Sequence, residues 1–317
     1  MRGIVAVLFG VLASCSDNET KAPIRDSPGG DTNTVNSGVG APVVLATGQA
    51  SPWALAIDEN NVYWVNSGTL GGVYSVPKAG GTTMALYEGA MGNVESIAVD
   101  GTAVYFPTPE AIVAVPLSGG SRQVLAQATR VLSLALANGE IYWIEAADLR
   151  TAIARKVSTT GGVSTSIGLP KTVWADAYFM TSGVGAVYAS MHSGGIVQIP
   201  LDGGAANHLD VGIARAMALD GDTIYFGGKD TVNMLSSTNA APQPLGSIQN
   251  PYGLAADPST LYVVDNTPTG RILKLAKTGG TLTPLAQNQG APHAIAIDEA
   301  NAYWTCAADG TIMKVAK

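Results

Sequence analysis

The stretch LAIDENNVYW, residues 55–64, returns near the other end of the chain as IAIDEANAYW, residues 295–304. Each copy is a short apolar run, a polar turn and a second run that ends in two aromatic residues. Short runs of this kind, bounded by turn-forming residues, predict a pair of β-strands. Weaker copies lie between the two, so the chain is built from repeats, and the repeat decides the fold class.

The spacing of one Tyr per repeat gives the period. Tyr63 and Tyr303 are 240 residues apart across six intervals, a mean of 40 residues. Periods of about 40–45 residues with strand-like content are typical of four-stranded propeller blades. The sequence therefore predicts an all-β fold, a seven-bladed β-propeller, with six or eight blades as the alternatives. The markers are Tyr63, Tyr105, Tyr142, Tyr188, Tyr225, Tyr262 and Tyr303.

Residue size within the repeat predicts how the blades pack. The first strand carries small residues, as expected where it lines the crowded centre of a ring, and the second and third strands are bulkier. Each large aromatic side chain buries about 150–250 Å², so we expect the Tyr/Trp pairs to fill the layers between blades. Gly-Gly pairs, as at residues 80–81, predict hairpin turns.

An Asp recurs at the first turn of five repeats. These residues lack the dense Asp-x-Asp-x-Asp-Gly spacing of a calcium loop. We expect each to accept hydrogen bonds from its own backbone two residues on, as turn Asp residues do. They are Asp58, Asp100, Asp220, Asp257 and Asp298.

Residues 43–47 resemble the fourth strand of a repeat, as in residues 282–289, whereas the last repeat ends after its third strand. We expect residues 43–47 to supply the missing outer strand and close the ring. The fourth repeat, residues 171–212, is the least regular, and residues 177–186 are interpreted as an insertion in it.

The N-terminal residues predict a lipoprotein. Met1-Arg2 and the apolar residues 3–13 have the length of a secretory signal rather than of a permanent membrane span. They end in LASC, residues 12–15, which resembles a bacterial lipobox with acylated Cys15; an ordinary cleaved signal is the alternative. We expect a signal peptide at 1–14, a polar flexible linker at 15–40 and the propeller at 41–317, anchored in the cell envelope at the outer membrane, on its periplasmic or surface face.

Charge and motifs exclude several functions. Lys and Arg number 17 against 24 Asp and Glu, a net charge of −7, and no basic cluster occurs, so nucleic acid is not an expected partner. Cys306 has no expected disulfide partner and is interpreted as a small buried residue. His192, His208 and His293 form no zinc motif. We expect a monomer without a cofactor.

One position predicts a binding site because it varies while its neighbours repeat. It lies two residues before the central Leu or Ile of each first strand, where the loops of a propeller form the mouth of the channel. We expect this mouth to bind a ligand; the alternative is a solvated, unconstrained position. The residues are Trp53, Glu95, Leu132, Trp174 or Asp176, Arg215, Tyr252 and His293. The loops between the second and third strands add weaker candidates: Asn66, Glu145, His192, Lys229, Asp265 and Thr305.

The repeats AID-x-x-x-VYW, residues 56–64, and AID-x-x-x-AYWT, residues 296–305, resemble those of YWTD-type and NHL-type propellers, over about residues 41–317. The resemblance implies a binding platform. A related group, the streptogramin lyases, are seven-bladed enzymes that use a divalent metal held by His and Glu at the channel mouth. His293 and Glu95 match that pattern in kind, and its second His has no clear counterpart. A further analogy is the lipoprotein propeller that assists outer-membrane protein assembly.

Our hypothesis from the sequence is a lipid-anchored, non-enzymatic propeller that presents a binding face to a protein, carbohydrate or small-molecule ligand. No residue is assigned a catalytic role. The alternative is a metal-dependent lyase or hydrolase that uses Glu95 and His293 at the channel mouth.

Overall fold

The computed structural model describes residues 40–68, 71–91, 94, 96–148, 151–170, 177–191, 194–236 and 241–317, without the side chains of residues 178 and 236. The predictions for residues 1–39, including Cys15, lie outside this range. In the described part of the chain, no helix has the length and apolar character needed to cross a membrane.

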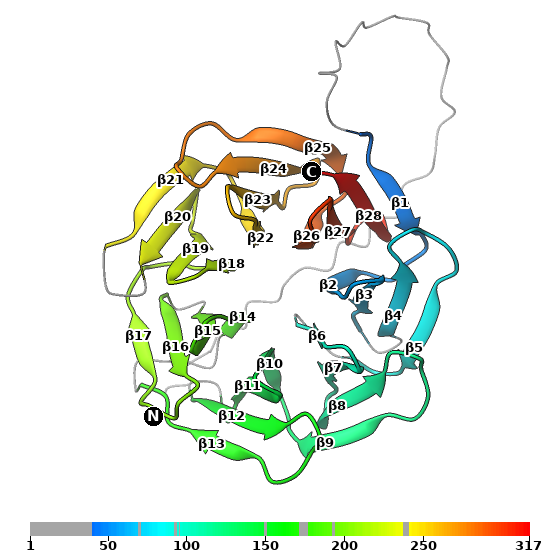
Figure 1. Ribbon diagram of the computed structural model, residues 1–317, viewed down its shortest axis with the longest axis vertical. Coiled ribbons are helices and arrows are strands. Elements are labelled where there is room, and N and C mark those ends of the chain that lie inside the picture. The colour runs from blue at the N-terminus through cyan, green and yellow to red at the C-terminus, as the bar shows by residue number, and fades with distance from the viewer. Residues whose placement is uncertain are drawn as a thin grey trace, which may run out of the picture. The chain divides into compact units, whose positions relative to one another are not determined.

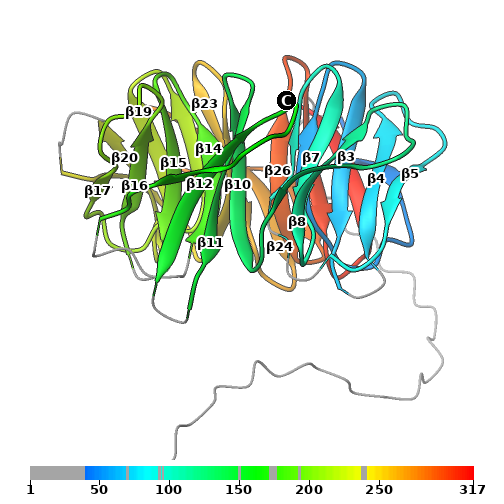
Figure 2. The ribbon, with the colours of Figure 1, turned by 90° about the horizontal axis from the view of Figure 1, so that it is seen from below.

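Seven antiparallel sheets of four strands each stand side by side around a central axis (Figure 1), with their strands running between the two ends of the ring (Figure 2). Numbered in chain order from the sheet that begins with β2, they are blades 1 to 7. The predicted seven-bladed β-propeller is confirmed. The inner strands are β2 (Pro52–Ile57), β6 (Ala98–Val99), β10 (Val131–Ala137), β14 (Ala177–Ser182), β18 (Met217–Asp220), β22 (Pro251–Ala256) and β26 (Pro292–Ile297).

The remaining strands follow outward in the same order. The second strands are β3 (Asn61–Asn66), β7 (Ala103–Pro107), β11 (Glu140–Ala146), β15 (Ala186–Met191), β19 (Thr223–Gly227), β23 (Thr260–Asp265) and β27 (Asn301–Cys306). The third strands are β4 (Gly72–Pro77), β8 (Ala111–Pro116), β12 (Ala152–Ser158), β16 (Ile196–Pro200), β20 (Thr231–Ser236), β24 (Gly270–Ala276) and β28 (Thr311–Ala316). The outer strands are β5 (Met84–Glu88), β9 (Gln123–Gln127), β13 (Thr165–Ile167), β17 (Asn207–Leu209), β21 (Gln243–Ser247), β25 (Thr283–Gln289) and, for blade 7, β1 (Val43–Ala46).

Strand β1 closes the ring as predicted. It pairs with β28, with Val43 opposite Lys314 and Val44 opposite Met313, so the last blade contains strands from both ends of the propeller. Gln49 extends the closure. Its side-chain oxygen accepts hydrogen bonds from the Trp64 indole at 2.9 Å and from the Asn66 amide at 3.0 Å. Blade 7 is thereby tied to blade 1.

The aromatic pairs fill the layers between blades, because neighbouring residues of a strand point to opposite faces of the sheet. Tyr63 packs in the core cluster shared by blades 1 and 2, whereas the adjacent Trp64 packs against Tyr303 in the cluster shared by blades 7 and 1. The same alternation recurs around the ring, so each pair contributes to two layers. The whole core of the described propeller therefore lies between blades.

Four of the five turn Asp residues act as predicted. In blade 7 one carboxylate oxygen of Asp298 accepts the N–H groups of Ala300 and Asn301, and the other accepts the Tyr303 hydroxyl at 2.9 Å. Asp58, Asp100 and Asp257 repeat this pattern. The prediction is wrong at Asp220. Gly221 gives this turn a left-handed φ of 54°, and the Asp220 carboxylate binds the Lys277 ammonium instead of the turn N–H groups.

Three of these Asp residues also bind a Lys of the next blade. Lys78, after β4, reaches back to Asp298 of blade 7 at 2.9 Å and lies 5.4 Å from the centre of the Tyr303 ring. Lys317 binds Asp257 at 3.1 Å, and Lys277 binds Asp220 at 2.6 Å. We call these three pairs the clasps. They join blades 5, 6, 7 and 1 in succession across the closure.

Blade 4 corrects the sequence interpretation. The segment interpreted as an insertion contains the inner strand β14 itself, which pairs with β15, Met180 lying opposite Ala189. Its sequence, AYFMTS, lacks the run of Ala, Leu and Ile that marks the other inner strands, and no Asp follows it. A strand in the interior of a ring can keep its pairing without that pattern.

Candidate functional site

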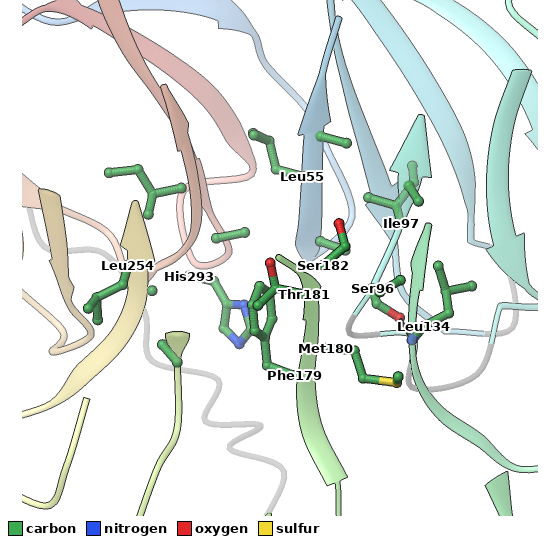
Figure 3. A pocket seen from close by; sticks show the side chains of 18 of the residues that line it. Leu55, Ser96, Ile97, Leu134, Phe179, Met180, Thr181, Ser182, Leu254 and His293 are labelled. Carbon is green, nitrogen blue, oxygen red and sulfur yellow. Dashed lines mark hydrogen bonds between the residues drawn. The ribbon is translucent and has the colours of Figure 1, made fainter. Parts of the chain in front are cut away.

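The axis of the propeller holds a cavity of about 350 Å³ that residues of all seven blades line. Figure 3 shows side chains from several inner strands around it, among them Leu55 of β2, Leu254 of β22 and His293 of β26. The lining is mostly Ala, Leu, Ile and Val, with the hydroxyls of Ser96, Thr181 and Ser182. A cavity of this size and apolar character is typical of small-molecule sites.

The mouth is the end of the ring where the inner strands begin. Three of the predicted residues come together there: the His293 ring lies 4.2 Å from the Trp53 ring and 4.6 Å from the Tyr252 ring, centre to centre. They come from blades 1, 6 and 7, which are consecutive in the closed ring. Arg215 lines the same cavity from blade 5. The structure therefore brings four predicted residues to one end of the channel.

The other predicted mouth residues do not join this group in the described structure. Glu95, Trp174 and Asp176 lie outside the described residues. In blade 4 the register places residue 178, two before Met180, at the position that Trp53 occupies before Leu55 in blade 1. The two alternatives from the sequence, residues 174 and 176, both place the inner strand too early in the chain. Leu132 packs at the edge of the cluster between blades 3 and 4.

The backbone before three of the inner strands has left-handed φ angles. Ser51, Arg130 and Ala291, each two residues before a predicted mouth position, have φ angles of 50°, 51° and 47°. Left-handed φ is uncommon for residues other than Gly and clusters at binding sites. The bend it produces starts β2 and β26, and so fixes where Trp53 and His293 stand.

His293 is a buried, neutral hydrogen-bond acceptor. Its Nδ1 lies 3.3 Å from the Trp53 carbonyl oxygen, which can only accept, so Nδ1 carries the proton. Burial lowers the pKa of His293 to about 4, against a smaller opposing effect of that carbonyl. Its Nε2 is buried and has no hydrogen-bond partner among the described residues. At neutral pH the ring therefore offers an unused lone pair, a costly arrangement in a folded protein unless something binds it.

Arg215 is held in place through a relay of amide side chains. Its guanidinium donates to the Asn250 side-chain oxygen at 2.5 Å, and the Asn250 amide donates to the Asn266 carbonyl at 2.5 Å. The Asn266 amide donates in turn to the Pro292 carbonyl at 2.9 Å, one residue before His293. The relay crosses from blade 5 to blade 7 and fixes Arg215 relative to the aromatic cluster.

The weaker candidates in the loops between second and third strands mostly hold the structure together. Thr305 donates to the Trp53 carbonyl at 3.3 Å and accepts the Ala294 N–H at 3.0 Å. It thereby holds the backbone of β2 and β26 together at the mouth. Asp265 pairs with Arg271, and Glu145 with Arg155 at 2.7 Å. Asn66 binds Gln49, Lys229 is exposed, and His192 lies outside the described residues.

A divalent metal does not fit the described mouth residues. The neighbours of His293 are an indole and a phenol, and the charged side chain on the cavity is a guanidinium, which repels cations. Within the described ranges, no three His, Cys, Asp or Glu side chains meet as a metal would require. Cys306 is buried at the end of β27, and burial raises the pKa of its thiol to about 11, which does not favour a nucleophile.

Comparison with known proteins identifies the fold. No family model and no curated protein matches the sequence. Among solved structures, virginiamycin B lyase from Staphylococcus aureus is 13% identical, with a TM-score of 0.69 over 87% of this chain and 98% of that chain. The catalytically inactive form of that enzyme with quinupristin gives 14% and 0.71 over the same shares. BamB from Moraxella catarrhalis is 15% identical, with a TM-score of 0.57 over 84% of this chain and 83% of that chain.

An extracellular domain of a hybrid two-component system from B. thetaiotaomicron is also similar, at 12% identity and a TM-score of 0.67, over 88% of this chain and 39% of that chain. The expected likeness to streptogramin-lyase-type propellers is confirmed. At these identities the likeness extends to the fold and leaves the ligand to be argued from the site.

Proposed function

We propose that this protein is a cell-envelope propeller, anchored through acylated Cys15, that binds a ligand at the mouth of its channel and serves as a binding scaffold. The observation that carries the proposal is His293, whose ring packs at a tilt against those of Trp53 and Tyr252 and whose Nε2 has no hydrogen-bond partner among the described residues. Aromatic side chains with a few fixed polar groups are the usual composition of ligand sites. The proposal includes no catalytic step.

The proposed location in the cell envelope rests on the lipobox-like LASC, residues 12–15, and agrees with the extracellular domain among the similar structures. It is tested by growing cells with an alkyne-labelled palmitate. The full-length protein should incorporate the label and partition with membranes, and Cys15→Ser should lose both. Label retained in Cys15→Ser would overturn the anchor and leave the binding proposal standing.

Ligand binding is tested with the full-length protein purified in detergent and incubated with envelope extract. Components that stay bound are identified by mass spectrometry. The wild type should retain a component that Trp53→Ala/Tyr252→Ala loses. Lys229→Gln, which changes an exposed residue of a mouth-side loop, should retain it. Identical components on all three proteins would overturn the proposal that the mouth binds.

A further inference from the structure

The charge around the cavity is of one sign. Its described lining contains one permanently charged side chain, Arg215, and no Asp, Glu or Lys. His293 is neutral above pH about 4. The protein as a whole is acidic, with a net charge of −7. A single cation in an apolar cavity of an acidic protein is a specific feature, because an unpaired charge is costly to desolvate.

The Arg215 guanidinium also has N–H donors that no described residue uses. Its bond to Asn250 uses one of the five guanidinium N–H groups. It forms no ion pair among the described residues, whereas Arg155 and Arg271 both pair with carboxylates. Planar guanidinium groups bind carboxylates through two parallel hydrogen bonds. The relay through Asn250 and Asn266 keeps the side chain in one orientation for such a partner.

The remaining lining of the cavity indicates which chemical groups the rest of the ligand carries. Tyr252 and the aliphatic inner strands offer an apolar and aromatic surface, and His293 has an Nε2 acceptor without a partner among the described residues. The volume of about 350 Å³ fits a small organic molecule and is too small for a folded partner.

We infer that the mouth binds a small organic monoanion: a molecule with a carboxylate for Arg215, an apolar or aromatic body, and an N–H or O–H donor for His293. This inference rests on the proposed function and names the chemical class of its ligand. Arg215 then supplies charge selectivity, and Tyr252 supplies affinity that does not depend on charge.

The test uses three probes of one shape that differ in charge: indole-3-acetate, neutral indole-3-acetamide and cationic tryptamine. Calorimetric titration of the full-length protein in detergent should rank them acid, amide, amine. The acid should bind about tenfold more tightly than the amide, the ratio expected for a hydrogen bond to a charged group. Arg215→Gln should remove that preference, and Arg215→Lys should keep part of it. Tyr252→Ala should weaken acid and amide equally.

Lys229→Gln is the matched control, since it removes a positive charge from the same blade without touching the cavity. It should leave the preference for the acid unchanged. Equal affinity for acid and amide, no measurable binding of the acid, or an unchanged preference in Arg215→Gln would each overturn the inference. If the mouth still retains an envelope component that Trp53→Ala/Tyr252→Ala loses, the ligand class alone is wrong and the proposed function stands.

Discussion

At one end of the ring, four turns repeat the same Asp with the same Tyr hydroxyl, and three clasps tie neighbouring blades together. At the other end, Trp53, Arg215, Tyr252 and His293 occupy one position of the repeat, and no two are alike. Strand β2 joins the two ends, since Trp53 lies near its start and Asp58 follows its last residue. The comparison indicates that the turn end repeats one stabilising pattern from blade to blade, whereas the residues of the mouth vary.

The largest expected difference comes from removing an aromatic ring at each end. Tyr303→Ala should cost about 3–5 kcal/mol of unfolding free energy, because the ring is 1% exposed and fills the closing layer. Trp53→Ala should cost less than half as much, since Trp53 is only half-buried. Urea denaturation of both variants measures the difference. Equal losses would show that the two ends contribute equally to stability.

The next largest difference between the two ends should be the pH dependence of their contributions to stability. The folded pKa of His293 is about 4, below its ordinary 6.5, so the unfolded chain takes up the proton first as the pH falls. Stability is therefore full above pH 6.5 and declines down to about pH 4, by roughly 3 kcal/mol. Unfolding free energies of wild type and His293→Gln at several pH values check this. The slope between pH 6.5 and 4 should flatten in the variant, and an unchanged slope would contradict it.

The turn Asp residues should keep their contribution to stability over the same pH range, in which His293 loses its contribution. Burial alone would raise the pKa of Asp298, but the Lys78 ammonium, the Asn301 N–H and the Tyr303 hydroxyl outweigh it and hold the pKa below its usual range. Its contribution is therefore present above the ordinary Asp pKa and is lost only as the pH falls through the lower folded value.

A smaller effect should follow from opening one clasp. Lys78→Met keeps the side-chain length and removes the ion pair with Asp298, which is partly exposed, so the loss should be about 1 kcal/mol. Asp298→Asn should cost less in the Lys78→Met background than in the wild type, because the two residues share one interaction. Urea titrations of the four proteins give the coupling energy; a value of zero would show that this clasp does not stabilise the ring.

The smallest effect on stability should come from the mouth cation. Arg215→Gln should change the unfolding free energy by no more than about 0.5 kcal/mol, since Arg215 forms no ion pair with the described residues. Thermal melting without ligand measures it. A loss as large as that of Lys78→Met would assign Arg215 to the scaffold instead of the binding site.

The sequence was sufficient for the parts of the fold that repeat. Each Tyr marker falls in a second strand, and the pairing of β1 with β28 follows from a missing outer strand at one end and a spare one at the other. Blade 4 was misinterpreted because the inner strand AYFMTS does not carry the repeat pattern. Pairing with β15 and packing between the inner strands β10 and β18 support that strand, and neither is visible in its composition.

The clasps and the geometry of the mouth could not be predicted for a different reason. Lys78 and Asp298 are 220 residues apart and meet only because the ring closes. The variable position of the repeat predicts which residues lie at the mouth. The proton on His293 Nδ1 and the relay to Arg215, however, depend on backbone carbonyls. No side-chain pattern encodes where a carbonyl points.

The closing strand has a consequence for biosynthesis. On the ribosome, Val43–Ala46 emerges before every other strand of the propeller, and its hydrogen-bonding partner, Thr311–Ala316, emerges after all the others. During translation the early strand is an uncapped edge that waits for the whole ring, and such edges can pair with foreign chains. The ring is complete only when the first and last segments of the propeller have joined, at a junction that Gln49 and Lys78 also hold.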